Sequence, residues 1–367
     1  MSQRNVFILL AVVIVLALLV TVGNRIRTPS TSSGETFVPG LEAALADIEQ
    51  VTVVKANGET VATLERRSDT WVVTEKNDYP ADVAKLRQGL RALGEAKILE
   101  AKTASADLYP RLGVEDVSRA DATGVAVSLK APGKELPTLI LGNTEGSKYR
   151  YTRRAADAQS YLIDRNPDLP RSTAQWLDAG IIDVRSDRVR QVTITHPDGD
   201  TLSLSKAAAG ESNYDVAGVP KGRELMYPGV ANVVGNSLRE LNLEDVELAT
   251  NPSEGDPVIV ELRTFDGLVV RALGVKRGDE SWVTFEASVD AQLASAAAAA
   301  PTEPAVAAPT TAAAAPDSAA APIAEAADPA AEAARINAKV GRWRYRIANF
   351  QYDQLTRRMA DLLKPPA

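Results

Sequence analysis

The longest apolar stretch of the chain is Val6–Val22, which contains no charged residue. As a helix it measures about 26 Å, and the hydrocarbon core of a bilayer is about 30 Å thick. A helix of this length can just span the bilayer, because spans begin at about 17 residues. We therefore predict a transmembrane anchor over residues 6–24, behind a short tail of residues 1–5. A cleaved secretory signal is the alternative, but Thr21–Gly23 makes a poor cleavage site because arginines follow at once.

After the anchor, residues 25–46 begin with a run of Ser, Thr, Pro and Gly and predict a flexible spacer, with a short helical turn over Leu41–Ile48. Asn57-Gly58 then separates two β-prone runs, which is a strong short-range hairpin signal. The predicted strands of this region are Val51–Val54, Val61–Leu64, Thr70–Thr74, Val125–Leu129, Thr138–Leu141, Lys148–Thr152 and Ser160–Ile163.

After Tyr79-Pro80-Ala81-Asp82 the apolar residues recur at the spacing of a helix, and the proline fits its first turn. The apolar face of this helix is predicted to be Val83, Leu86, Leu90 and Leu93. A second, short helix is predicted over Leu169–Leu177. Together these elements predict a first α+β unit over residues 47–178.

The pattern then repeats. Tyr79–Ala101 aligns without a gap on Tyr227–Ala249, and Asn57-Gly58 has a counterpart in Asp198-Gly199. We therefore predict an α+β fold made by tandem duplication of one unit, in which antiparallel strands and hairpins pack against helices. The second unit covers residues 187–288 plus 335–364.

The second unit is interrupted by residues 289–334, which are mostly Ala and Pro. Repeated prolines oppose a continuous helix, so a disordered or semi-extended excursion is predicted. The flanking strands, Ser281–Glu286 and Gly341–Ile347, are still expected to pair. A terminal helix over Tyr352–Leu363 is predicted to complete the unit.

Composition narrows the function. The net charge of −7 argues against nucleic acid as the main partner, and the absence of cysteine excludes a lipoprotein anchor. The single histidine, His196, precedes Pro-Asp-Gly and is interpreted as a turn residue. Ser203 and Lys206 have the spacing of some serine hydrolases, but in a strand they point oppositely. No catalytic residue, cofactor or metal ligand is predicted.

One surface signal points to binding. Arg342, Arg344 and Arg346 alternate with apolar residues, so a strand places the three guanidinium groups on one face. Lys148 and Arg150 repeat the pattern more weakly. We predict a surface for an anionic ligand or acidic partner there, the alternative being an ordinary amphipathic strand with its polar face in water.

The motifs of the first unit resemble those of bacterial proteins with domain of unknown function 4340. The residues that carry the resemblance are Trp71-Val72-Val73, Tyr79-Pro80-Ala81-Asp82, Leu112-Gly113-Val114, Leu141-Gly142 and Tyr149-Arg150-Tyr151. It implies a membrane-anchored envelope protein, often accompanying ABC transporters of the gliding-motility type, with a periplasmic body. The flanking charges alone leave the orientation tied. The second unit departs from the pattern, because it lacks a Leu-Gly-Val equivalent.

Three hypotheses follow. The first is a non-enzymatic accessory subunit, anchored in the bacterial inner membrane by one span, that binds an ABC transporter permease or another envelope protein. The second is a periplasmic substrate-binding module that takes an anionic or glycan ligand. The third, a hydrolase, has the least support.

Overall fold

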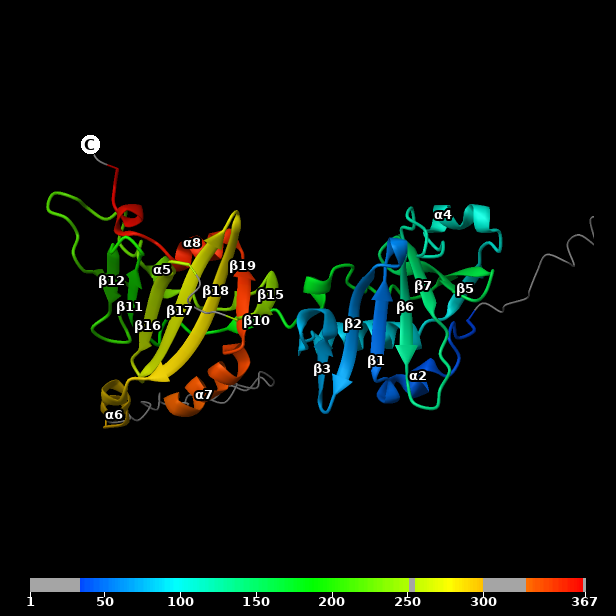
Figure 1. Ribbon diagram of the computed structural model, residues 1–367, viewed down its shortest axis with the longest axis horizontal. Coiled ribbons are helices and arrows are strands. Elements are labelled where there is room, and N and C mark those ends of the chain that lie inside the picture. The colour runs from blue at the N-terminus through cyan, green and yellow to red at the C-terminus, as the bar shows by residue number, and fades with distance from the viewer. Residues whose placement is uncertain (1–33, 251–254, 300–327, 366–367) are drawn as a thin grey trace, which may run out of the picture. The chain divides into compact units, whose positions relative to one another are not determined.

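The computed structural model describes residues 34–250, 255–299 and 328–365 (Figure 1). These residues form two compact units, each built from two separate stretches of the chain. The first comprises the chain up to Val72 together with Ala81–Trp176, and the second comprises Val73–Pro80 together with the chain from Leu177 onward. The predicted anchor lies outside the described residues. Within them, no helix is both long and apolar enough to span a bilayer.

The first sheet has nine strands in the order β4-β3-β2-β1-β6-β7-β8-β9-β5, and the pairings described are antiparallel. All seven of the strands predicted for this region recur within a few residues of their expected ends. The bounds are β1 Gln50–Val54, β2 Thr60–Arg67, β3 Thr70–Val73, β4 Tyr79–Pro80, β5 Ile98–Ala101, β6 Val125–Lys130, β7 Leu139–Glu145, β8 Tyr149–Arg154 and β9 Ser160–Ile163.

The predicted hairpins are confirmed. Asn57 and Gly58 adopt φ values of 61° and 67°, the left-handed conformation that Asn-Gly tolerates best, between β1 and β2. In the second unit Gly199 has a φ of 86° and joins β11 (Val189–Thr195) to β12 (Thr201–Ser205).

The helices of the first unit are α2 (Leu41–Ala44), α3 (Val83–Gly94) and α4 (Tyr109–Leu112). The Asp82 side chain caps α3 by accepting a hydrogen bond from the amide of Lys85 at 3.0 Å. Of the predicted apolar face of this helix, Leu86, Leu90 and Leu93 are buried, as predicted, and Val83 is half-buried. The predicted helix over 169–177 is reduced to a 3-10 turn, Thr173–Trp176.

The spacer predicted over residues 25–46 ends earlier than expected. Phe37 and Leu41 are fully buried in the first unit, and the amide of Phe37 donates to the carbonyl of Ala96 at 2.8 Å. The polar composition of the preceding residues led the prediction to place Phe37 and Leu41 in the spacer, although burial of these two large apolar side chains stabilises the core.

The second sheet has eight strands in the order β13-β12-β11-β16-β17-β18-β19-β15. This order matches β3-β2-β1-β6-β7-β8-β9-β5 of the first sheet position by position. A separate two-stranded sheet joins β10 and β14. The bounds not yet given are β10 Gly180–Ile182, β13 Asp215–Val216, β14 Leu241–Asn242, β15 Asp245–Leu248, β16 Val258–Thr264, β17 Leu268–Arg277, β18 Glu280–Val289 and β19 Trp343–Ile347.

The helix expected over Tyr227–Ala249 is largely absent. Only α5, Asn232–Gly235, is helical, and the segment then turns and enters β14 and β15. Several Gly and Asn residues lower the helix propensity of this copy. The predicted terminal helix is likewise divided into α8, Asn349–Leu355, and a 3-10 turn, Met359–Leu362.

The strands that flank the Ala/Pro-rich insertion pair as predicted, with Ser281 opposite Ile347 and Val283 opposite Tyr345. The described ends of the insertion differ from the expectation, because both are helical: α6 covers Ala291–Ala299 and α7 covers Pro329–Val340. In α7, Glu332 and Ala333 are buried, so the second unit resumes at Pro329 rather than at residue 335. Residues 300–327 lie outside the description. Overall, the α+β class is confirmed, with strands predominating.

Candidate functional site

The predicted basic residues of the first unit have different surroundings. Lys148 lies in the turn between β7 and β8 and is exposed. Arg150 is buried, and its guanidinium donates to the carbonyl of Gly142 at 2.9 Å and to the side chain of Asn166 at 2.7 Å. Burial lowers the pKa of Arg150. This arginine therefore ties its strand to a neighbour inside the fold.

In the second unit the strand begins after Arg342, which lies in the preceding turn. Arg344 and Arg346 do share one face of β19, as predicted, but each meets a glutamate of a neighbouring strand. Arg344 is 2% exposed and lies 3.3 Å from Glu247, and Arg346 lies 2.6 Å from Glu280. Their charges are thus compensated within the sheet. For Arg342, no ion pair is formed among the described residues.

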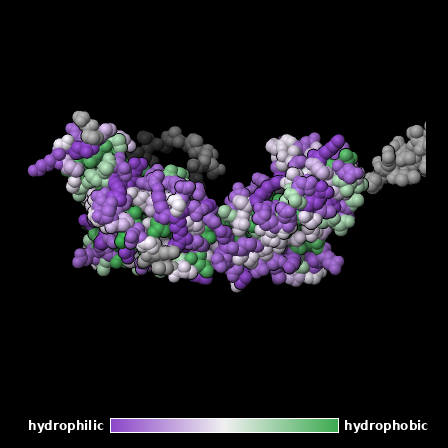
Figure 2. Space-filling model, turned by 45° about the horizontal axis from the view of Figure 1, so that its top comes forward, coloured by the Kyte–Doolittle hydropathy of each residue, from purple (hydrophilic) through white to green (hydrophobic). Residues whose placement is uncertain are grey.

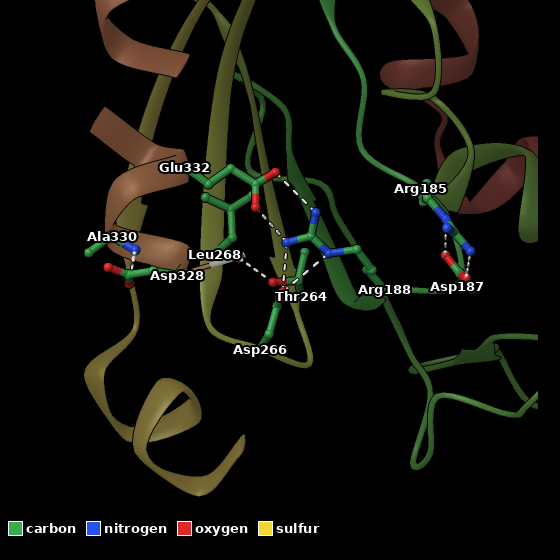
Figure 3. Close-up of polar contacts among 9 residues, drawn as sticks. All are labelled: Arg185, Asp187, Arg188, Thr264, Asp266, Leu268, Asp328, Ala330 and Glu332. Atoms are coloured by element: carbon green, nitrogen blue, oxygen red, sulfur yellow. Dashed lines mark hydrogen bonds and ion pairs between the residues drawn. The ribbon is translucent and has the colours of Figure 1, made fainter. Parts of the chain in front are cut away.

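A half-buried arginine, Arg188, attaches α7 to the sheet (Figure 3). The guanidinium of Arg188 contacts Glu332 of α7 through two hydrogen bonds of 3.0 and 2.7 Å, and Asp266 of the β16–β17 turn at 2.6 Å. The hydrogen bond with Glu332, then that with Asp266, raises the pKa of Arg188. At the start of α7, Asp328 accepts from the amide of Ala330 at 3.0 Å. We call Arg188, Asp266 and Glu332 the arginine node, and its geometry indicates a structural role.

A cleft in the second unit has a volume of about 690 Å³. Its walls come from the ends of β16 and β17, from α8 and the turn that follows it, and from His196. We call it the polar cleft. The charged residues that line it are Asp256, Lys276, Asp353, Arg357, Arg358 and Asp361.

Most of these charges are paired within the protein. Lys276 lies 3.2 Å from Asp353, and Arg358 lies 2.8 Å from Asp198 and 3.1 Å from Asp200. Desolvation opposes the rise in the pKa of Arg358 that these carboxylates cause. An anionic group entering the cleft therefore finds these two cations already engaged.

Arg357 is the exception. Among the described residues its guanidinium forms no ion pair, and its Nε is buried without a hydrogen-bond acceptor. Its carbonyl oxygen lies 3.5 Å from Nε2 of His196, whose imidazole is 6% exposed. A carboxylate or phosphate bound beside Arg357 would supply the acceptor that a guanidinium requires.

Two polar groups on the wall of the polar cleft are already hydrogen-bonded within the protein. The hydroxyl of Thr356, which lies on its wall, already donates to the carbonyl of Tyr352 at 2.8 Å. His196 holds the β-turn as the sequence predicts, because its amide donates to the carbonyl of Asp200 at 2.9 Å. Among the described residues, no group of three or more His, Asp or Glu side chains is placed to hold a metal ion.

Sequence reasoning missed Arg357 as a functional candidate. The available signal was the adjacent pair Arg357-Arg358 on the polar side of the predicted terminal helix. What the sequence does not provide is the position of this segment beside β17 and His196, which lie far from it along the chain.

The surface of both units is mostly hydrophilic on the face seen in Figure 2, with apolar residues scattered among polar ones. The most exposed large apolar side chains described are Phe350, at 64%, and Tyr227, at 59%. Isolated residues of this kind are common on soluble surfaces and do not by themselves mark an interface.

The sequence matches a family model described as Domain of unknown function (DUF4340) over residues 71–259, just over half of the chain. The chain belongs to the DUF4340 family. Comparisons with curated proteins and with solved structures found no match. The DUF4340 match begins in β3 and ends in β16, so it includes parts of both sheets.

The DUF4340 motif residues in the first unit hold a loop against the sheet. A Cβ atom on Gly142 would lie 2.2 Å from the carbonyl oxygen of Leu112, so only glycine allows this approach. Gly113 has a φ of 68°, which glycine also favours. Arg153, which is buried, donates to the carbonyl of Val114 at 3.0 Å. These contacts give the motif a structural explanation.

Tyr79, another motif residue, is part of the core of the second unit. Its ring meets that of Trp343 at 5.0 Å and that of Tyr345 at 6.2 Å, both edge to face. Burial raises the pKa of Tyr79, and its hydroxyl donates to the carbonyl of Asp178 at 3.2 Å. A tyrosine here supplies both aromatic packing and a satisfied polar end.

Proposed function

We propose that this DUF4340 protein is a non-enzymatic accessory and binding protein, tethered to the bacterial inner membrane by Val6–Val22, with its body in the periplasm. It works with an ABC-type transporter or another envelope complex. The apolar run, long enough to span a bilayer, supports the tether. The gliding-motility association that the family resemblance implies supports the transporter as partner.

We further propose that the two units arose by duplication. Eight strands of the second sheet follow the same order as eight strands of the first, which supports a common ancestor. The copies have since diverged, because the twelve-residue α3 corresponds to the four-residue α5.

The observation that carries the binding proposal is Arg357. It is a cation without an ion-pair partner among the described residues, at the wall of a cleft whose other cations are paired. An acidic side chain of an envelope partner would complete its hydrogen bonds. Of the basic surface predicted from the sequence, Lys148 and Arg342 are exposed and remain secondary contacts in this proposal.

A periplasmic substrate-binding role is the second candidate, and the volume of the polar cleft favours it. Small-molecule sites commonly enclose roughly 300–1,000 Å³, and this cleft, at about 690 Å³, has room for a uronic acid or a phosphorylated sugar. Arg357 would then hold the anionic group of a free ligand instead of a partner's carboxylate.

Co-purification from detergent-solubilised membranes tests the first role. The full chain is expected to retain a transporter permease, identified by mass spectrometry, and Arg357→Gln is expected to lose it. Arg239→Gln, which changes an exposed arginine elsewhere on this unit, is the matched control and should retain the permease. The mass of the mature chain tests the tether, since cleavage after the apolar run would overturn it.

Thermal unfolding with glucuronate or inorganic phosphate separates the second role from the first. A ligand present at 100 times its dissociation constant stabilises the folded state by about 2.7 kcal/mol. A rise in melting temperature that Arg357→Gln abolishes would establish the substrate-binding role. If the full chain retains no permease and its melting temperature does not rise with either ligand, both candidates are refuted.

A further inference from the structure

A second pocket lies where β18 and β19 separate. Their pairing ends at Val283 opposite Tyr345. Beyond this point β19 continues beside β15, with Trp343 opposite Leu248, while β18 continues beside β17 to Val289. The opening has a volume of about 410 Å³ and is distinct from the polar cleft. Its lining residues are Ala249, Arg271, Leu273, Thr284, Phe285, Glu286, Asn337, Gly341 and Trp343.

Asn337 of α7 keeps the far end of this opening in place. Its side-chain amide replaces the missing strand at Ala287, accepting from the amide and donating to the carbonyl, both at 2.7 Å. Residues two apart in a strand present their backbone groups to the same side. The N–H and C=O of Phe285 therefore face the same side as those of Ala287, toward the opening.

The interior of the pocket combines aromatic walls with an unused polar group. Phe285 and Trp343 supply the rings, and Leu273 adds an aliphatic side chain. Thr284 is 6% exposed, and its hydroxyl has no hydrogen-bond partner among the residues that the structure describes. A buried hydroxyl without a partner is unfavourable, so this position favours a ligand that brings a hydrogen-bonding group.

The rim carries an excess of positive charge. Arg271 lines the pocket and is exposed, and Arg342 lies with its guanidinium 5.5 Å from the centre of the Trp343 ring. Neither arginine forms an ion pair among the described residues. Glu286, opposite Arg271 in the strand register, is the one acidic residue in the described lining. One net positive charge is left to attract an anion.

We propose that the opening between β18 and β19 is a binding site for a small aromatic monoanion. The rings of Phe285 and Trp343 hold the flat apolar body, the hydroxyl of Thr284 bonds a polar substituent, and Arg271 with Arg342 holds the anionic group. The site is independent of the polar cleft, so the proposal does not rest on the accessory or transport role.

The test uses two fluorescent probes with the folded chain. 1-Anilinonaphthalene-8-sulfonate is an aromatic monoanion, and N-phenyl-1-naphthylamine is its neutral analogue. The anion is expected to bind with one-to-one stoichiometry and more tightly than the neutral probe. Because a charge-assisted contact contributes appreciable free energy, Arg271→Gln and Arg342→Gln are each expected to weaken binding of the anion about tenfold. Binding of the neutral probe should not change.

Two further variants locate the site. Ala249→Phe fills the pocket and should abolish binding of both probes. Arg185→Gln, an exposed arginine paired with Asp187 outside the pocket, is the matched control and should bind normally. Near-UV circular dichroism confirms that each variant is folded, because a loosened core also binds such dyes. A folded Ala249→Phe chain that binds both probes normally would overturn the pocket, and equal binding of both probes by all variants would overturn the anion recognition.

Discussion

Replacing Arg188 by methionine tests whether the arginine node holds α7 to the sheet. The substitution keeps most of the side-chain volume but leaves two carboxylates facing each other, and Glu332 is only 8% exposed. Removing one partner of a buried ion pair costs about 3–5 kcal/mol. Since Arg188 and Asp266 are 27% and 29% exposed, we expect the lower end, about 3 kcal/mol.

Urea unfolding measures this loss, and hydrogen exchange of the α7 amides shows where it acts. Exchange in Pro329–Val340 should accelerate more than exchange in β1, which belongs to the other unit. The matched control is Arg185→Met, three positions earlier in the chain, whose pair with Asp187 is 73% and 55% exposed (Figure 3). An exposed pair of this kind contributes about 0–1 kcal/mol. Equal losses from both substitutions would refute the structural role of the node.

Three other outcomes are expected. Gly142→Ala places a Cβ 2.2 Å from a backbone oxygen and should lower the unfolding free energy by about 2–3 kcal/mol, whereas Gly210→Ala, with open space around it, should change it little in urea titrations. Thr284→Val removes a buried hydroxyl without a partner, so urea unfolding should show a gain of about 1 kcal/mol; a loss would mean that the hydroxyl is satisfied. The amide of Leu293 lowers the pKa of Asp290, so the stability from this cap is present above the carboxyl's ordinary pKa and is lost as pH falls through the lowered value. Acid titration of Asp290→Asn should lack this component, and identical acid curves would contradict it.

Local signals in the sequence predicted the fold well. Asn57-Gly58 and Asp198-Gly199 specify their hairpins through backbone conformation alone, so each prediction needed only neighbouring residues. The pairing of β18 with β19 across the insertion followed from the first unit, where two strands are joined directly. The prediction of a helix after Tyr227 was wrong because it did not rest on the local residues. It was carried over from the first copy, although its own Gly and Asn residues oppose a helix.

The candidate sites were less predictable because they depend on contacts between distant segments. Alternation identified Arg344 and Arg346 as sharing a face, but their glutamate partners belong to β15 and β18 and become neighbours only in the folded sheet. Arg357 lies in a predicted amphipathic segment and acquires significance only beside His196 and the end of β17. The β18–β19 opening has no linear signal, since it arises where two strands stop pairing.

The order of the two sheets has a practical consequence for anyone who expresses fragments. Residues 71–259, the extent of the DUF4340 match, lack β1 and β2 from the middle of the first sheet, and most of β16 and all of β17 to β19 from the second. Such a fragment would leave the hydrogen-bonding edges of β6 and β11 open, and exposed edges of this kind promote aggregation. Recombinant work on this protein therefore needs both complete sheets, although the DUF4340 match covers only part of each.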